Sequence, residues 1–177
     1  EVDNQPTTDI PVNEVTDTAS EVPELNNVTA TDSAENALLS MKYGDFAVVA
    51  SGIPEAIQVE NNNIKVDFTT KGGFVSKVEL KGYESYGGGP LILVNEDHDF
   101  NLYVDHQSKR INLNELYFQP SVSEFADSTV VDFKLIVAGA SLTYPYIIPE
   151  EGYQIDQQLI NRGFDKIIEA KNPTLFW

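Results

Sequence analysis

The chain has 177 residues, a formal net charge of −17 and no cysteine, and 41% of its residues are hydrophobic. This length and hydrophobic share are enough for one domain with a substantial core. The missing cysteine excludes disulfides and thiolate metal sites. Nucleic acid and anionic lipid are disfavoured as partners, because both are bound through clustered lysine and arginine. No apolar run approaches the roughly 20 residues that cross a bilayer.

The acidic charge is unevenly distributed along the chain. Residues 1–45 hold ten acidic side chains and one basic side chain, whereas residues 46–177 hold eighteen acidic and ten basic side chains. Residues 1–31 are rich in Thr, Asn, Asp, Glu, Pro and Val without a sustained hydrophobic period. Such a segment cannot bury enough surface to offset its ordering entropy. We therefore expect an acidic, disordered tether over residues 1–31.

Residues 32–55 predict a short helix and a lead-in to the body. Asp32 and Glu35 have the spacing of a capping box, and Gly44 lies where a glycine would end the helix. One helical face is apolar, with Ala34, Leu38 and Met41. Residues 46–50 and 56–60 are expected as short strands on either side of a Gly-Ile-Pro turn.

The clearest pattern in the chain predicts a β-hairpin over residues 64–80. Ile64, Val66 and Phe68 alternate with polar residues, which is typical of a half-buried strand. Gly72 and Gly73 follow and can adopt the positive φ of a tight reversal. A second extended segment then places Phe74, Val78 and Leu80 on its even positions.

Further strands are expected after this hairpin. They fall at residues 91–94 (buried), 100–104, 111–118 (ended by Pro120), 129–137, 142–148, 153–159, 166–170 and 172–177. Pro145 indicates an edge or bulged strand for residues 142–148. Turn signals recur at short spacing and no long amphipathic helix supplies a crossover, so residues 56–177 predict an antiparallel all-β sandwich. Because the chain stops on the apolar Trp177, we expect the natural polypeptide to continue and the sandwich to be incomplete.

The few candidates for a chemical site are weak. His98 and His106 lie among acidic residues, Asp97, Asp99 and Asp105, but their spacing does not favour a metal site. Residues 87–89 are three glycines without the following Lys-Ser/Thr of a phosphate-binding loop, so they predict a plain loop. Ser141 lacks the second glycine of a nucleophile elbow and is expected to serve a turn. No catalytic, cofactor-binding or metal-binding residue is assigned, and no enzyme activity or cofactor is expected.

Six tyrosines leave two interpretations open. They are Tyr83, Tyr86, Tyr103, Tyr117, Tyr144 and Tyr146. Their rings could line a groove for an apolar segment or a sugar, or they could cap the core of a sandwich. The first interpretation leads to a hypothesis of a carbohydrate-binding or carbohydrate-active domain.

Two blocks of sequence, residues 59–93 and 142–156, resemble a known family. Residues 59–83 contain a strand, a Lys-Gly-Gly turn, a second strand rich in Val and Leu, and a Lys-Gly-Tyr loop. Residues 90–93 read Pro-Leu-Ile-Leu, and residues 142–156 contain a tyrosine-rich strand, a proline turn and a Tyr-Gln-Ile-Asp segment. Together they resemble the start of the large periplasmic domain of the YidC membrane protein insertases, in the form found in Bacteroidetes-type bacteria. The resemblance covers residues 57–177.

The resemblance implies a β-supersandwich of the galactose-mutarotase-like type, on the periplasmic side of the bacterial inner membrane. The acidic segment would then tether the domain to a preceding transmembrane helix. The implied role is non-catalytic: a scaffold or docking surface that supports insertion and folding of inner-membrane proteins. The implied partners are Sec translocon components and nascent inner-membrane proteins, and no catalytic residue of the family falls within this chain.

Overall fold

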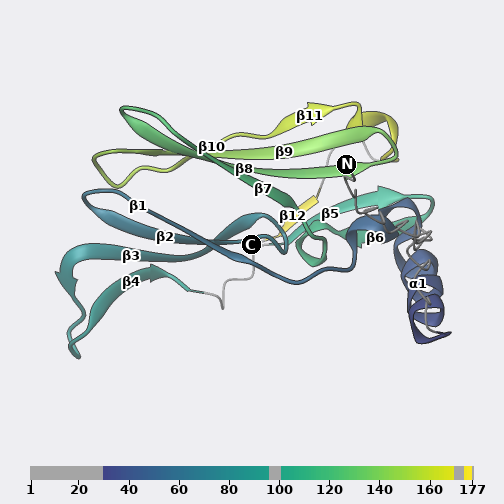
Figure 1. Cartoon of the computed structure of the whole chain (residues 1–177), viewed down its shortest axis with the longest axis horizontal. Coiled ribbons are helices and arrows are strands. Elements are labelled where there is room, and N and C mark those ends of the chain that lie inside the picture. Colours follow the sequence, from purple (N-terminus) through teal and green to yellow (C-terminus); the bar gives the residue numbers. More distant parts are fainter. Residues whose placement is uncertain (1–29, 96–100, 170–173, 177) are drawn as a thin grey trace, which may run out of the picture.

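The computed structural model describes residues 30–95, 101–169 and 174–176, and it joins one N-terminal helix to a body of antiparallel sheets (Figure 1). The helices are α1 (Ala30–Tyr43) and the 3-10 helices η1 (Gly44–Val49), η2 (Leu113–Glu115) and η3 (Phe164–Lys166). The first strands are β1 (Ala56–Glu60), β2 (Ile64–Thr69), β3 (Phe74–Glu84), β4 (Pro90–Val94), β5 (Asn101–His106) and β6 (Lys109–Asn112). The remaining strands are β7 (Gln119–Glu124), β8 (Ser128–Val137), β9 (Ala140–Pro149), β10 (Asp156–Gln157), β11 (Ile160–Arg162) and β12 (Thr174–Phe176).

The strands form three sheets. One sheet has the order β1-β2-β3-β4, the second has the order β10-β9-β8-β7 with β11 also on β9, and the third has the order β12-β5-β6. All pairings between these strands are antiparallel. The first two sheets lie over one another as two layers, with β5, β6 and α1 towards one end (Figure 1). The predicted all-β antiparallel sandwich with a short N-terminal helix is therefore confirmed.

The β2–β3 hairpin has the predicted alternation and turn. Ile64, Val66 and Phe68 are buried, and Ile64 pairs with Leu80 at the open end of the hairpin. Both glycines of the turn have positive φ, 85° at Gly72 and 65° at Gly73. The turn is also tight, because a Cβ on Gly73 would lie 2.9 Å from Cβ of Phe133 in the facing sheet.

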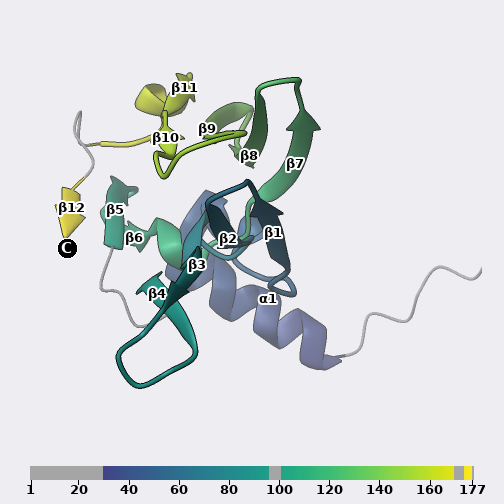
Figure 2. The ribbon, with the colours of Figure 1, turned by 90° about the vertical axis from the view of Figure 1, so that its left-hand side faces the viewer.

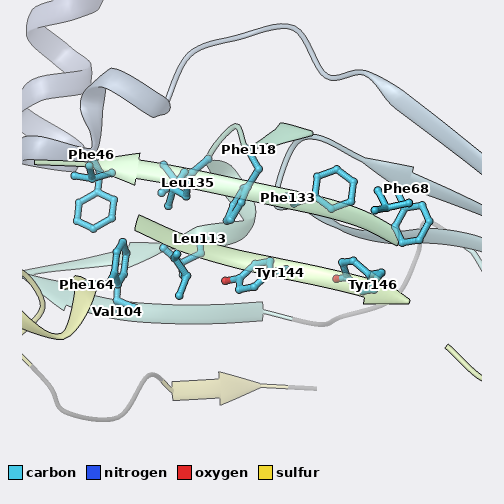
Figure 3. Packing of buried hydrophobic residues seen from close by; sticks show 14 of the residues in the cluster. Phe46, Phe68, Val104, Leu113, Phe118, Phe133, Leu135, Tyr144, Tyr146 and Phe164 are labelled. Carbon is cyan, nitrogen blue, oxygen red and sulfur yellow. The ribbon is translucent and has the colours of Figure 1, made fainter. Parts of the chain in front are cut away.

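Aromatic side chains fill the space between the two main layers (Figure 3). Phe68 of β2 has its ring centroid 5.7 Å from Phe133 of β8 and 5.0 Å from Tyr146 of β9. Phe118 stacks on Tyr144 with centroids 5.1 Å apart. The Phe68 contacts tie the two sheets together, because they join β2 of one sheet to β8 and β9 of the other.

The β8–β9 hairpin has two residues in its turn. Ala138 and Gly139 both have positive φ, 49° and 79°, as a turn matched to strand twist requires. Ser141 therefore belongs to strand β9 and not to the turn, where it was predicted.

The predicted edge or bulge at Pro145 is wrong. Strand β9 lies inside its sheet, and its register with β8 is unbroken. The Pro145 nitrogen points away from β8, towards the side of β9 that pairs with β10 and β11. These two short strands are separated at this point, where the Gln158 N–H donates to the Pro145 carbonyl at 2.9 Å. The missing N–H is accommodated by a break in the neighbouring strand.

The N-terminal region differs from the prediction in three ways. Helix α1 begins at Ala30, so Asp32 lies within the helix and not at the predicted capping position before it. The predicted apolar face of α1 points away from the body, with Leu38 66% and Met41 74% exposed, and the helix packs on the body through Leu39 and Tyr43. Gly44 ends the helix with a φ of 60°, as predicted. The following segment, predicted as a strand over residues 46–50, forms η1, because this turn inserts Phe46 into the core.

Several later boundaries also differ. Strand β4 is at the edge of its sheet and Leu93 is 59% exposed, so the strand is not buried as predicted. The predicted strand over residues 111–118 is interrupted by η2, whose first turn is capped by the Asn112 side chain. Pro120 lies inside β7 and does not end a strand. Of the predicted strand over residues 153–159, only β10 forms. The predicted strand over residues 166–170 is not seen in its described part, because Lys166 belongs to η3 and residues 167–169 form no strand. Within residues 172–177, the described strand is β12.

Candidate docking surfaces

The described histidine, His106, is a structural residue that joins three elements. It lies at the end of β5 and is buried, with Nδ1 against the Ile167 carbonyl and Nε2 3.1 Å from the Asp45 carboxylate of η1. Its ring also meets Phe46 edge-on, with centroids 5.2 Å apart. His98 and its acidic neighbours lie outside the described residues. Among the described residues no three His, Asp or Glu side chains come together as a metal site would require.

The glycine loop and Ser141 have local structural roles. The Gly88 N–H donates to the Ser85 carbonyl and the Ser85 hydroxyl donates to the Gly88 carbonyl, at 2.9 and 2.7 Å. The loop therefore forms a closed turn between β3 and β4. Ser141 pairs with Ile136 on one side and with Arg162 on the other, within the sheet.

The six tyrosines do not assemble into one groove. Tyr144 and Tyr146 are core residues, and burial raises the pKa of both hydroxyls. Tyr83 and Tyr86 are exposed, one at the C-terminal end of β3 and the other in the loop that follows. Tyr103 on β5 lies under the Arg110 guanidinium, whose Cζ is 4.9 Å from the centre of the tyrosine ring. For Tyr144 and Tyr146 the interpretation as core residues is confirmed.

The contacts of α1 with the body form a polar latch, which we define as Lys42, Tyr43 and Glu115. The Lys42 ammonium donates to the Glu115 carboxylate at 2.8 Å, and the Tyr43 hydroxyl donates to the same oxygen. The Lys42 and Tyr43 hydrogen bonds hold the pKa of Glu115 below its ordinary value. Burial, followed by the bond to Glu115, raises the pKa of Tyr43. The latch fixes the C-terminal end of α1 beside η2.

Two hollows lie at the first sheet. A hollow of about 330 Å³ between the layers is mostly apolar and is lined by Phe74, Val75, Val78, Val94, Tyr146, Ile155 and Gln157. A second hollow of about 490 Å³ has opposite charges in its lining, Glu55 and Lys71. Such surfaces can receive apolar or mixed side chains of a partner, and sequence patterns alone did not reveal either hollow because their linings come from separate strands and loops.

The edge strand β7 is a further surface that the sequence pattern did not reveal. All six residues from Gln119 to Glu124 are exposed, and β7 is the last strand of its sheet. Pro120 disfavoured a strand at this point. The signal that marks it is the alternation of Pro120 and Val122 with Ser121 and Ser123.

The fold and its surfaces define a class of protein. The described chain is a β-sandwich in which His106 and the polar latch join elements of the fold, and whose candidate sites are an inter-sheet hollow and an exposed strand edge. These features are typical of a binding or scaffold domain.

Comparison with known proteins then identifies the family. The chain is 31% identical over 150 residues to the membrane protein insertase YidC of Cytophaga hutchinsonii, which covers 84% of this chain and 24% of that protein. It is 32% identical over 142 residues to the Porphyromonas gingivalis YidC, covering 78% of this chain and 22% of that protein. The Chlorobaculum parvum YidC is 25% identical over 173 residues, covering 88% of this chain and 30% of that protein. The chain belongs to the YidC family of membrane protein insertases.

The match concerns one segment of these relatives. The chain spans about a quarter of the length of the curated proteins it resembles. No family model matches the chain, and no solved structure matches it significantly. None of the helices in the described ranges is long and apolar enough to cross a membrane.

Proposed function

We propose that the chain is a non-catalytic, periplasmic domain of a membrane protein insertase and that it supports the insertion and folding of inner-membrane proteins as a docking surface. The observation that carries this proposal is the similarity to several insertases over most of this chain, all named for membrane protein insertion. The proposed partners are Sec translocon components and nascent inner-membrane proteins.

The geometry supports a binding role in preference to a catalytic one. The buried His106 is tied into structural contacts with η1 and with the residues after η3. The exposed features are apolar or backbone in character: the inter-sheet hollow and the β7 edge. Surfaces of this kind recognise polypeptides by shape and by main-chain hydrogen bonding.

A chimeric insertase tests the proposal. The corresponding segment of the full-length C. hutchinsonii relative is replaced by this chain, and the chimera is expressed in cells depleted of their own insertase. We expect inner-membrane protein insertion, measured by protease protection of labelled clients, to recover towards the level given by the unaltered relative.

A second chimera provides the control. It carries an unrelated β-sandwich of similar size in the same place and should recover less insertion, because it lacks the docking surface. Equal recovery by the two chimeras would contradict a docking role for this chain, and no recovery with this chain would contradict the assignment as an insertase domain.

A further inference from the structure

The hydrogen-bonding parity of β7 shows which backbone groups face its open side. The Phe125 N–H donates to the Ser128 carbonyl at 2.8 Å, which makes this a hydrogen-bonded pair in the β7–β8 ladder. Hydrogen-bonded and non-hydrogen-bonded pairs alternate along an antiparallel ladder. Ser123 and Ser121 therefore bond to β8, whereas the backbone groups of the even residues point away from β8.

The open side of β7 thus presents a defined set of donors and acceptors. Val122 and Glu124 each offer an N–H and a carbonyl, and Pro120 offers a carbonyl alone because proline has no N–H. Pro120 is tolerated in β7 for this reason, since its nitrogen is not needed by the β8 ladder. No element of the described chain pairs with this side of β7.

The side chains beside this edge indicate the kind of strand that fits. Val122 and Pro120 pair with the buried Val131 and Phe133, so they lie on the core-facing side of the sheet, yet Val122 remains 48% exposed. Strand β1 lies on the same side of the two layers as β7 (Figure 2). Because Val122 and Pro120 lie on the core-facing side, a strand added to β7 would place alternate apolar residues beside them.

Charge indicates the orientation and composition of the partner. Glu124 is exposed at the end of β7 and forms no ion pair in the part of the chain that is described. Asp127 follows in the turn to β8 and is also exposed. In an antiparallel arrangement the first residue of an added segment lies opposite Glu124, so a basic residue fits there.

We propose that the β7 edge binds an extended polypeptide segment by antiparallel strand addition, and that the preferred segment has a basic residue followed by alternating polar and apolar residues. Five backbone hydrogen bonds would form, two each at Val122 and Glu124 and one at the Pro120 carbonyl. That the natural partner is a client polypeptide rests on the proposed function. That the β7 edge can bind an extended segment rests on the β7–β8 register alone.

Peptide binding to the purified 177-residue chain tests this proposal. The probe is a dye-labelled Lys-Thr-Val-Thr-Val peptide, and binding is followed by fluorescence anisotropy. Val122→Pro removes one donor and blocks the edge, and we expect it to weaken binding by about tenfold or more. Ile136→Ala, at an exposed aliphatic residue of the same sheet, should leave binding unchanged. The reversed peptide, Val-Thr-Val-Thr-Lys, should bind several-fold more weakly.

A gain-of-binding variant keeps the test decisive if Val122→Pro disturbs folding. Pro120→Thr adds a sixth hydrogen-bonding group to the open edge and should tighten binding by about threefold to tenfold. Absence of probe binding, or equal binding by the wild type, Val122→Pro and Pro120→Thr, would overturn the proposal.

Two measurements would show that something other than a partner polypeptide occupies the β7 edge. A dimer in sedimentation equilibrium that Val122→Pro dissociates would assign the edge to a second copy of the chain. Slow amide exchange at residues 122 and 124 in the peptide-free chimeric insertase would assign it to another segment of the same polypeptide. Either result would overturn the proposal without affecting the chimera test of the proposed function.

Discussion

Tyr144 and Tyr146 lie two residues apart on β9, and their hydroxyl groups have different surroundings. The Tyr146 hydroxyl donates to the Gly73 carbonyl at 3.0 Å and accepts from Gln157 Nε2 at 2.9 Å. The Tyr144 hydroxyl is buried without a hydrogen-bond partner among the described residues. Tyr146 therefore links the β2–β3 turn to β9, whereas the Tyr144 ring contributes by packing.

Replacing each tyrosine by phenylalanine should separate these roles. Tyr146→Phe removes the hydroxyl that donates to the carbonyl of the buried Gly73 and should lower the free energy of unfolding by about 1 to 2 kcal/mol. Tyr144→Phe removes an unpaired buried hydroxyl and should change it by less than about 0.5 kcal/mol, or raise it. Urea titration measures both. Equal losses in the two variants would contradict the hydrogen bonding described for Tyr146.

Gly73 offers a second test at this scale. Gly73 and Gly82 both have positive φ, 65° and 80°, but an added Cβ at Gly82 would meet nothing within 4 Å, whereas at Gly73 it would approach Phe133 and Phe118. Gly82→Ala should cost about 1 kcal/mol from the backbone alone. Gly73→Ala should cost about 2 to 4 kcal/mol, because the contact with the facing sheet adds to that strain. Similar thermal midpoints for the two variants would argue against this close approach of the two sheets.

At the scale of elements, the polar latch holds the end of α1 on the body. Its carboxylate, Glu115, has a lowered pKa, so the latch stabilises the fold above the unfolded pKa of about 4.3 and loses this contribution as the pH falls through the folded value. Lys42 and Glu115 side chains are 63% and 42% exposed, so the contribution is below about 1 kcal/mol.

Glu115→Gln should therefore flatten the acid side of the stability profile. We expect the variant to be less stable than the wild type at pH 7 and to approach it below about pH 4, because the wild type loses the latch on protonation. Glu151→Gln, at an exposed carboxylate without an ion pair in the described residues, is the matched control. Stability curves that stay parallel for wild type and Glu115→Gln between pH 3 and pH 7 would rule out this role.

Elements with a strict period could be predicted from the sequence, and elements set by tertiary contacts could not. Alternation was sufficient for β2, where one face is buried along the whole strand, and a run of β-branched residues was sufficient for β8. The helical spacing of Leu38 and Met41 predicted the wrong face of α1, because Tyr43 and its partner Glu115, 72 residues away, orient the helix. Strand β7 was missed because the tolerance for Pro120 depends on which side of the strand faces β8.

At the scale of the whole molecule, two packed sheets leave strand edges exposed in the described part of the chain. The two central hairpins, β2–β3 and β8–β9, meet across the layers through Phe68, whose ring contacts Phe133 and Tyr146. The outer strands β1, β4 and β7 lie at sheet edges. The family could be predicted from short sequence blocks, but the docking edge required knowledge of the register between β7 and β8.

Site-specific photocrosslinking in the chimeric insertase tests the central claim, that this domain docks polypeptides during membrane protein insertion. A photoreactive phenylalanine analogue is placed at residue 122 on the β7 edge or at residue 136, which is comparably exposed on β8 of the same sheet. During synthesis of a labelled inner-membrane protein, we expect a crosslink to the nascent chain from residue 122 and little or none from residue 136. Equal crosslinking from the two positions, or none from residue 122, would contradict it.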